Sequence, residues 1–220
     1  MKLLLFITGH GQLKEYDYFN EFLQKLKLNH LCDIHIYCNN PSISSDIVKY
    51  YHNFEQKNKY LTITSQNSGY RTGGVEAVSQ GFDMGLFSSY DYVIHIHPDV
   101  FITDDTYLLS VLNTHFTDDI AFFLTRSVPN DPKFASFDFF IFKPKILTTN
   151  IFKDELYTFT SSPEHYLYNM INKYNIPYIF IKRFENDTWH PRRIDDHLKL
   201  YHEHNLHMVQ CLLQNSTDKK

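Results

Sequence analysis

The 220-residue chain is poor in cysteine, glycine and net charge, and each shortage excludes a class of protein. Its 3 cysteines, Cys32, Cys38 and Cys211, are odd in number and widely spaced, which argues against a disulfide framework and a CxxC metal knuckle. A formal net charge of -4 lacks the basic footprint of a dedicated nucleic-acid-binding protein. We therefore expect a protein of the reducing cytoplasm that does not bind nucleic acid.

Long apolar runs are also missing from the sequence. No stretch approaches the ~18 apolar residues that a membrane-spanning helix needs. The amino terminus, MKLLLFITGHG, has an apolar run too short for a secretory signal, and no small-residue cleavage site follows it. We expect a buried strand over 3–8 there, and no transmembrane segment anywhere in the chain.

The sequence does contain ample apolar material, with 43% hydrophobic residues, 19 Phe and 16 Tyr. This is enough to bury a sizeable core. Short apolar runs predict strands over 3–8, 33–37, 60–64, 92–97, 120–125, 137–142 and 178–181. Helical spacing or start signals predict helices over 19–26, 74–86 and 104–112, from 163 onward, and over 195–213.

The order of these elements indicates the fold class. Strands alternate with helices through the first ~125 residues, which predicts βαβ units and a mostly parallel sheet covered on both faces. After residue 125 the order is mixed. With no repeat or linker in sight, we expect one domain over 1–220, with a frayed tail over 214–220.

Three of the 7 glycines lie in one short segment directly before a predicted helix, between Asn67 and Gly74. Glycine permits positive φ and close approach of backbone to a ligand, here at Gly69, Gly73 and Gly74. Gly73 and Gly74 at a helix start would leave free N–H groups for an anion, and Arg71 adds a charge. The segment is neither a Walker A nor a G-x-G-x-x-G motif. A tight turn without a ligand is the alternative.

The predicted strand over 92–97 ends in histidine and aspartate. Because side chains alternate along a strand, His95, His97 and Asp99 could share one side if the chain stays extended past Pro98. We expect His95 in the core. A carboxylate at Asp99 beside the His97 imidazole suits a divalent cation that holds phosphate oxygens. The alternative is that Asp99 only forms a turn.

Two carboxylates farther along the chain are candidates for function. Asp138 is the only charge in the apolar run SFDFFIF, and such a carboxylate must be paired or functional. Arg126 or Lys143 could pair with it. Glu164 lies in the first turn of a predicted helix, where it either faces a cleft or is a surface residue favoured by the helix dipole.

The carboxyl-terminal quarter is rich in histidine. A loop over 185–193 holds the only tryptophan, Trp189, next to His190 and two arginines, and could close over an anionic ligand or simply be solvated. In the predicted last helix, His197, Tyr201 and His204 recur at i, i+4 and i+7. On a surface helix this spacing favours solvated histidines over ligands.

Taken in order, these segments resemble a GT-A fold glycosyltransferase that uses a nucleotide-diphosphate sugar. The resemblance covers roughly residues 1–190 and is carried by the first strand, Asn39 after the second, the run N-x-G-x-x-x-G-G-x-x-A-x-x-x-G from residue 67, and the acidic motif after the fourth strand. The chain looks most like small glycosyltransferases of large DNA viruses. This implies a Rossmann-like, three-layer α/β fold with a mostly parallel, mixed central sheet.

The resemblance also implies a metal site. His97-Pro98-Asp99 takes the place of the family's D-x-D motif, so Asp99 would bind the Mn²⁺ or Mg²⁺ that bridges the two phosphates. His97 replaces the first Asp, which usually helps to hold ribose or metal, and this departure leaves strict metal dependence open. His190 corresponds to the downstream histidine that completes the metal shell in some members.

The remaining roles follow from the same resemblance. Base and ribose of the donor would lie near Thr8, Gly9 and Asn39. The full set of expected donor-binding residues is Thr8, Gly9, Asn39, Asn67, Gly69, Arg71, Gly73, Gly74, His97 and Trp189. Glu164 lies where inverting members often place the catalytic base, and Asp138 is the competing candidate. Residues 1–125 become the nucleotide-sugar half and 126–213 the acceptor half.

The sequence therefore predicts an enzyme that moves a sugar from a UDP- or GDP-sugar to a hydroxyl of a glycan or glycoprotein, with metal assistance and inverting transfer favoured. One alternative is a small metal-dependent hydrolase, because His95-x-His97 resembles the metal-binding H-x-H of barrel hydrolases, although a full barrel needs about 250 residues. The other alternative is a non-catalytic module that binds a sugar nucleotide or glycan.

Overall fold

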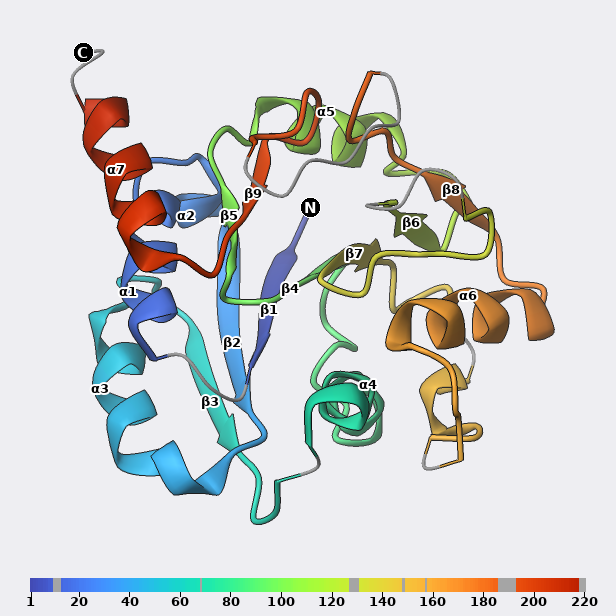
Figure 1. Cartoon of the computed structure of the whole chain (residues 1–220). Helices are drawn as coiled ribbons and strands as arrows, with labels where there is room; N and C mark the ends of the chain where they lie inside the picture. The colour runs from blue at the N-terminus through green and yellow to red at the C-terminus, as the bar shows by residue number, and fades with distance from the viewer. Residues whose placement is uncertain are drawn as a thin grey trace.

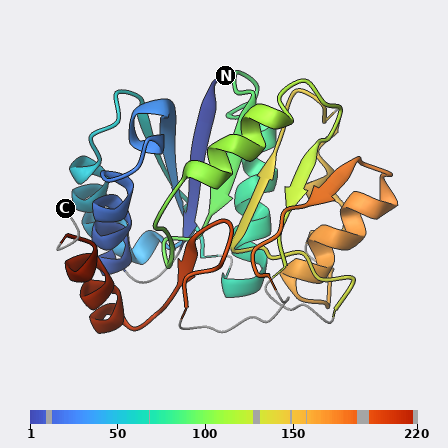
Figure 2. The same ribbon diagram turned by 90° about the horizontal axis from the view of Figure 1, so that it is seen from above.

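The computed structural model describes residues 1–9, 13–67, 69–126, 131–147, 149–156, 158–185 and 193–217. In this part of the chain a seven-stranded sheet lies between helices on its two faces (Figures 1 and 2). The predicted three-layer α/β architecture with a mixed, mostly parallel sheet is confirmed. Within the same residues, no helix is long and apolar enough to cross a membrane.

The central sheet has the strand order β3-β2-β1-β4-β7-β6-β8. Its strands are β1 (Leu3–Gly9), β2 (Cys32–Cys38), β3 (Lys59–Ile63), β4 (Tyr92–Ile96), β6 (Phe122–Leu124), β7 (Phe139–Phe142) and β8 (Tyr178–Phe180). β7 runs antiparallel to both of its neighbours, β4 and β6, and the other pairs are parallel. Each of these strands was predicted from its apolar run to within two residues at either end.

Alternation along β1 shows how the layers form. Leu3, Leu5 and Ile7 face a core shared with α1 (Leu13–Leu23), α3 (Ser44–Asn53), α5 (Thr106–Thr114) and α7 (Leu206–Thr217). Leu4 and Phe6 face the opposite core, shared with α4 (Gly69–Asp83) and α6 (Pro163–Lys173). Because both faces are covered, β1 is apolar at every position from Leu3 to Ile7. Short elements complete the fold: α2 (Leu28–Leu31), η1 (Pro41–Ile43) and η2 (Ile151–Lys153).

Helix α4 begins earlier than its sequence predicts, at Gly69 and not at Gly74. Gly73 and Gly74 therefore lie in its second turn, where N–H groups bond to carbonyls one turn back. The prediction of two free N–H groups at these glycines is wrong. The glycines instead allow close packing. A Cβ at Gly73 would lie 1.6 Å from Asn39 Nδ2, and one at Gly74 would lie 2.8 Å from Phe137 Cε1.

The predicted helix over 195–213 is also wrong, since its first half contains a strand. β9 (Leu200–His202) pairs antiparallel with β5 (Val100–Ile102), and α7 begins only at Leu206. Lys199 has a positive φ of 56°, which a continuing helix does not accommodate. This difference matters for the site, because side chains two residues apart in an extended chain point to the same side of the strand.

We predict that Gly81→Ala destabilises the protein. In a helix interior this change ordinarily stabilises. Here the new Cβ would lie 2.2 Å from Cζ of Phe87, whose ring is buried against Phe6. We expect a net loss of about 1–3 kcal/mol from overpacking, measured by urea unfolding. Ser110→Ala on the exposed face of α5 is the control and should change stability by less than about 0.5 kcal/mol. A stabilised Gly81→Ala variant would contradict the packing described.

Candidate functional site

Polar side chains gather where the strands of the central sheet end. β4 stops at Ile96 and is followed by His97 and Asp99. Because β7 is antiparallel, its first residue pairs with the end of β4, and the His97 N–H donates to the Asp138 carbonyl at 3.0 Å. Arg183 follows the end of β8. In open α/β sheets this edge is where ligands bind.

A cluster of three potential metal ligands lies at this edge. Oδ2 of Asp99 is 3.1 Å from Nε2 of His202 and 3.1 Å from Nδ1 of His204. One ligand atom from each of the three residues lies within 4.8 Å of the others. We call Asp99, His202 and His204 the edge cluster.

Strand pairing explains how residues 103 positions apart meet. β5 begins directly after Asp99 and pairs with β9, with Val100 opposite His202. Figure 1 shows β9, in orange-red, beside β5. The Glu203 N–H also donates to the Asp99 carbonyl at 3.2 Å. The small β5–β9 sheet therefore carries both histidines to the end of β4.

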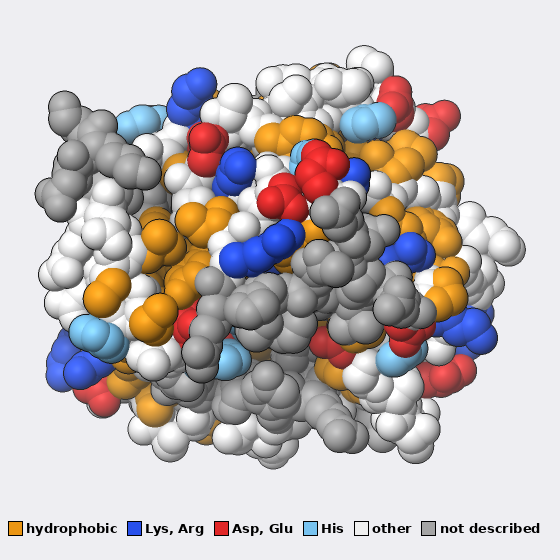
Figure 3. All heavy atoms as spheres, turned by 45° about the horizontal axis from the view of Figure 1, so that its top comes forward, with side chains coloured by type: hydrophobic (Ala, Val, Ile, Leu, Met, Phe, Trp, Pro, Cys, Tyr) orange, Lys and Arg blue, Asp and Glu red, His pale blue; other side chains and the backbone are white. Residues whose placement is uncertain are grey.

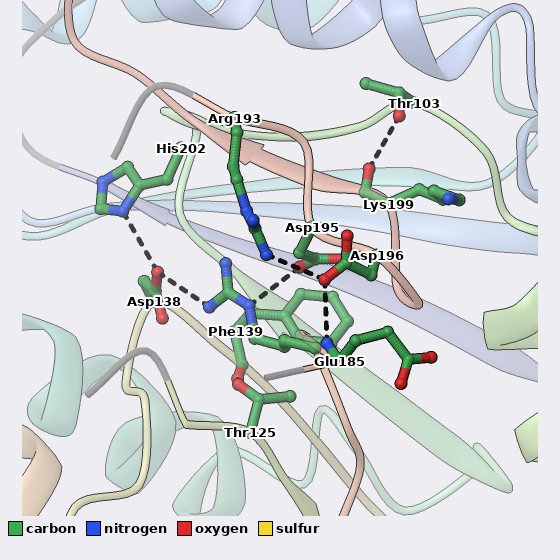
Figure 4. A network of polar contacts seen from close by, with 11 residues as sticks. Thr103, Thr125, Asp138, Phe139, Glu185, Arg193, Asp195, Asp196, Lys199 and His202 are labelled. Carbon is green, nitrogen blue, oxygen red and sulfur yellow. Dashed lines mark hydrogen bonds and ion pairs between the residues drawn. The ribbon is translucent and has the colours of Figure 1, made fainter. Parts of the chain in front are cut away.

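Asp138 continues the cluster on its other side. Its Oδ2 lies 3.3 Å from Nδ1 of His202 and 3.7 Å from Nη1 of Arg183 (Figure 4). The partners that the sequence suggested for Asp138 are wrong: Lys143 donates to carbonyls around His115, and the Arg126 guanidinium lies over the Phe180 ring. Asp138 is therefore paired, but with groups of the site itself.

Charges of opposite sign stabilise one another in this cluster. Burial by itself would raise the pKa of Asp99, but the hydrogen bonds with His202 and His204 hold it well below its usual range. Burial likewise opposes ionisation of Asp138, yet His202 and Arg183 lower its pKa to about 2. Burial would lower the pKa of His202, but the two carboxylates raise it to about 10. On the face that Figure 3 turns toward the viewer, acidic and basic side chains lie close together on the surface.

Several buried polar atoms near the edge cluster have no hydrogen-bond partner among the described residues. They include Oδ1 of Asp99, Oε1 of Glu15 and the hydroxyl of Tyr16, and Oδ1 of Asn39, directly after β2, has no partner either. Each residue is at most 9% exposed. Buried polar atoms are normally satisfied, so a group of unsatisfied ones indicates a place for a ligand.

Glu15 is the most unusual of these groups. It lies in the first turn of α1, just past β1, and is 4% exposed. Burial, and then the charge of Asp99, raise the pKa of Glu15 to about 8. The carboxyl is therefore largely protonated at neutral pH and can donate a hydrogen bond.

The residues predicted around β1 and β2 have defined surroundings. The Thr8 hydroxyl is engaged with Nε2 of His95 at 2.8 Å, and His95 is fully buried as expected. A side chain at Gly9 would collide with the Tyr16 hydroxyl at 2.7 Å, so glycine lets the start of α1 approach β1. Nδ2 of Asn39 donates to the Gly69 carbonyl at 3.4 Å, which leaves its Oδ1 without a partner among the residues described.

The other predicted residues are placed as follows. His97 lies outside the edge cluster, with its ring against those of His95 and Phe137, and burial lowers its pKa. The Asn67 side chain accepts the Gly69 N–H at 2.9 Å. Glu164 is half-buried in the first turn of α6, as the sequence predicts. Trp189, His190 and the side chain of Arg71 lie outside the described residues.

Sequence reasoning missed His202, His204, Glu15 and Arg183. The signal for the histidines was present, because His202 and His204 are two apart, as ligands on one side of an extended chain must be. It was hidden by the helical spacing of His197, Tyr201 and His204. In the structure His197 instead pairs with Glu185 at 2.9 Å.

The edge cluster fits a divalent metal ion. It offers one carboxylate and two imidazoles, and the buried Oδ1 of Asp99 has no partner among the described residues. Three protein ligands leave coordination positions open for a substrate, as catalytic sites require. Imidazole nitrogens suit transition metals, whereas Mg²⁺ prefers a shell of oxygens.

No protein-family model matches the chain, and no curated protein matches it in sequence. Among solved structures, it is similar to the mannosyltransferase PcManGT from Pyrobaculum calidifontis in complex with GDP-Man and Mn2+. The TM-score is 0.49 and the sequence identity is 7%. The match covers 64% of this chain and 44% of that one, so less than half of the mannosyltransferase is represented.

We predict a pH signature for Glu15. Its pKa is raised from 4.5 to about 8, so between these values the folded state binds more protons than the unfolded state. The contribution of Glu15 to stability therefore falls as pH rises through this window. The stability of Glu15→Gln relative to wild type should therefore increase as the pH is raised from about 5 to about 8, measured by thermal melts in EDTA. Glu21→Gln, exposed on the same helix, should show no such gain. Equal differences at both pH values for Glu15→Gln would show that the carboxyl is not held neutral.

Proposed function

We propose that the protein is a metal-dependent GT-A glycosyltransferase that transfers a sugar from a UDP- or GDP-sugar to a hydroxyl of a glycan or glycoprotein. The observation that carries this proposal is the edge cluster: Asp99, directly after the fourth strand, shares its Oδ2 with His202 and His204. It lies beside unpartnered buried groups that can take the rest of a donor.

The edge cluster would hold the metal. When bound there, Mn²⁺ stabilises the negative charge that the departing diphosphate develops. Two of the three ligands are imidazoles, so Mn²⁺ is favoured over Mg²⁺. His202 and His204 thus take the place that the sequence assigned to His190, and His97 supports the site from outside the cluster.

The donor nucleoside would lie between β1, β2 and α1. Glu15, protonated near neutral pH, donates to a hydroxyl or base acceptor of the donor, and Oδ1 of Asn39 accepts from a donor N–H or O–H. Gly9 lets the Tyr16 hydroxyl, which has no partner among the described residues, approach the end of β1. A buried site with complementary donors and acceptors discriminates strongly, because a ligand that lacks the matching group leaves these atoms unpaired.

Glu164 is the favoured general base for an inverting transfer. It lies in the first turn of α6 and is half-buried. A carboxylate of this kind removes the proton of the attacking hydroxyl. Asp138 is the weaker candidate, since it is engaged by His202 and Arg183.

We predict that Asp99→Asn loses metal-assisted donor binding while remaining folded. Wild-type protein should be stabilised by UDP- or GDP-sugar with Mn²⁺, by about 2.7 kcal/mol when the donor is at 100 times its Kd. Asp99→Asn should show neither this thermal shift nor sugar transfer, because the only carboxylate of the edge cluster is neutralised.

Asp118→Asn is the matched control for that experiment. Asp118 forms a similar aspartate–histidine contact with His115, at 2.6 Å, but on the surface. This variant should retain the wild-type shift. Full transfer activity in Asp99→Asn would refute the assignment of the edge cluster as the metal site.

We predict that Glu164→Gln lowers turnover on the order of 10²-fold or more, the usual contribution of a positioned base. The donor-dependent thermal shift should stay close to that of wild type, because the residue acts on the acceptor. Unchanged turnover would transfer the role to Asp138 or point to a retaining mechanism. Donor binding without any turnover in wild type would indicate a binding module instead.

A metal-dependent hydrolase is the second candidate, supported by the composition of the edge cluster. Two histidines and one carboxylate also form the ligand set of some hydrolytic zinc sites. Calorimetry separates the two functions. A transferase should bind Mn²⁺ more tightly in the presence of a UDP- or GDP-sugar, whereas a hydrolase of another substrate should bind the metal equally well with or without it.

A further inference from the structure

We infer that Asp138 is a positioning residue for His202, an inference that rests on the proposed metal site. Asp138 fixes which ring nitrogen of His202 is free to bind the metal. A buried pair, Arg183 with Asp195, holds Asp138 in this role. Asp138 thus acts through His202 and need not touch the substrate.

The two ring nitrogens of His202 face two different carboxylates. Nε2 lies 3.1 Å from Oδ2 of Asp99, and Nδ1 lies 3.3 Å from Oδ2 of Asp138. An imidazole that binds a metal through one nitrogen commonly donates its other N–H to a carboxylate, which fixes the tautomer and the ring orientation. Asp138 occupies this second position. With a metal bound, the proton would therefore stay on Nδ1, and Nε2 would be left to bind the metal beside Asp99.

Buried charged neighbours hold the Asp138 carboxylate in place. Its side chain is 14% exposed, and Nη1 of Arg183 lies 3.7 Å from the same Oδ2 that faces His202. The Arg183 side chain is 2% exposed, and its Nε donates to Asp195 at 2.9 Å. A buried carboxylate needs such compensation to remain charged.

The same pair also fixes the strand that carries His202. The Asp195 N–H donates to the carbonyl of Leu200, the first residue of β9, at 3.0 Å (Figure 4 shows Asp195 beside this segment). Arg183 follows β8 and Asp138 precedes β7, so one buried ion pair connects the ends of two sheet strands to the segment bearing the ligand. His204, at 60% side-chain exposure, lacks comparable burial. The inference therefore concerns His202 alone.

The test measures Mn²⁺ affinity of the full chain, without donor, by electron paramagnetic resonance of free Mn²⁺. We expect Asp138→Asn to weaken Mn²⁺ binding by about 10–100-fold, the usual effect of losing such an outer partner. His202→Ala serves as the reference for loss of the ligand itself. Asp118→Asn, which alters the surface pair with His115, should bind like wild type. Asp138→Glu should recover part of the affinity, because the carboxylate is retained.

A second measurement needs no variant. In wild-type protein loaded with diamagnetic Zn²⁺ and labelled with ¹⁵N in histidine, the His202 ring should carry its proton on Nδ1 and bind through Nε2. The reverse tautomer overturns the inference, even if Asp138→Asn fails to fold.

The remaining outcomes separate this inference from the proposed function. If His202→Ala loses Mn²⁺ and Asp138→Asn binds like wild type, Asp138 is not a positioning residue, but the metal site stands. If wild-type protein binds neither Mn²⁺ nor Zn²⁺, the edge cluster is not a metal site and both conclusions are refuted.

Discussion

The arrangement of the site depends on the shared carboxylate of Asp99. A carboxylate that is only 9% exposed is tolerated when opposite charges or hydrogen bonds compensate it. Its partners, His202 and His204, come from the far end of the chain, and they reach it only because β9 pairs with β5. Two three-residue strands therefore decide where the polar end of the molecule forms, and Val100, Phe101 and Leu200 anchor them in the apolar core.

Opposite charges alternate away from that carboxylate. Asp99, His202, Asp138, Arg183 and Asp195 form a continuous series in which each negative group adjoins a positive one. Such a series keeps side chains in place before any ligand arrives, which lowers the cost of binding. Some atoms of this series, such as Oδ1 of Asp99 and Oδ1 of Asp138, have no hydrogen-bond partner among the described residues, and the same holds for Oε1 of Glu15. The ion pairs thus hold side chains whose remaining oxygens a ligand can satisfy.

The strands could be predicted well, whereas two helix assignments failed for identifiable reasons. Strands buried on both faces are continuously apolar, and that pattern is unambiguous in β1 or β7. The glycines at 73 and 74 suggested a turn, but they are small because Asn39 and Phe137 pack against the helix there. In the carboxyl-terminal segment, Leu198, Leu200 and His202 follow a two-residue period, although the helical spacing of His197, Tyr201 and His204 overlaps it. When a short segment has both spacings, the sequence alone does not distinguish a strand from a helix.

By itself the sequence determined the α/β class, the strands of the central sheet, and Asp99 as the carboxylate that follows the fourth strand. These features depend on local burial and on the simple rule that ligands gather where parallel strands end. Only the tertiary structure decided which groups surround Asp99. His202, His204, Arg183 and Glu15 come from separate segments, and their meeting depends on strand pairing and helix packing across more than 80 positions of chain. Contacts of that range leave no periodic trace in the sequence, because each segment is compatible with many partners until the whole core is packed.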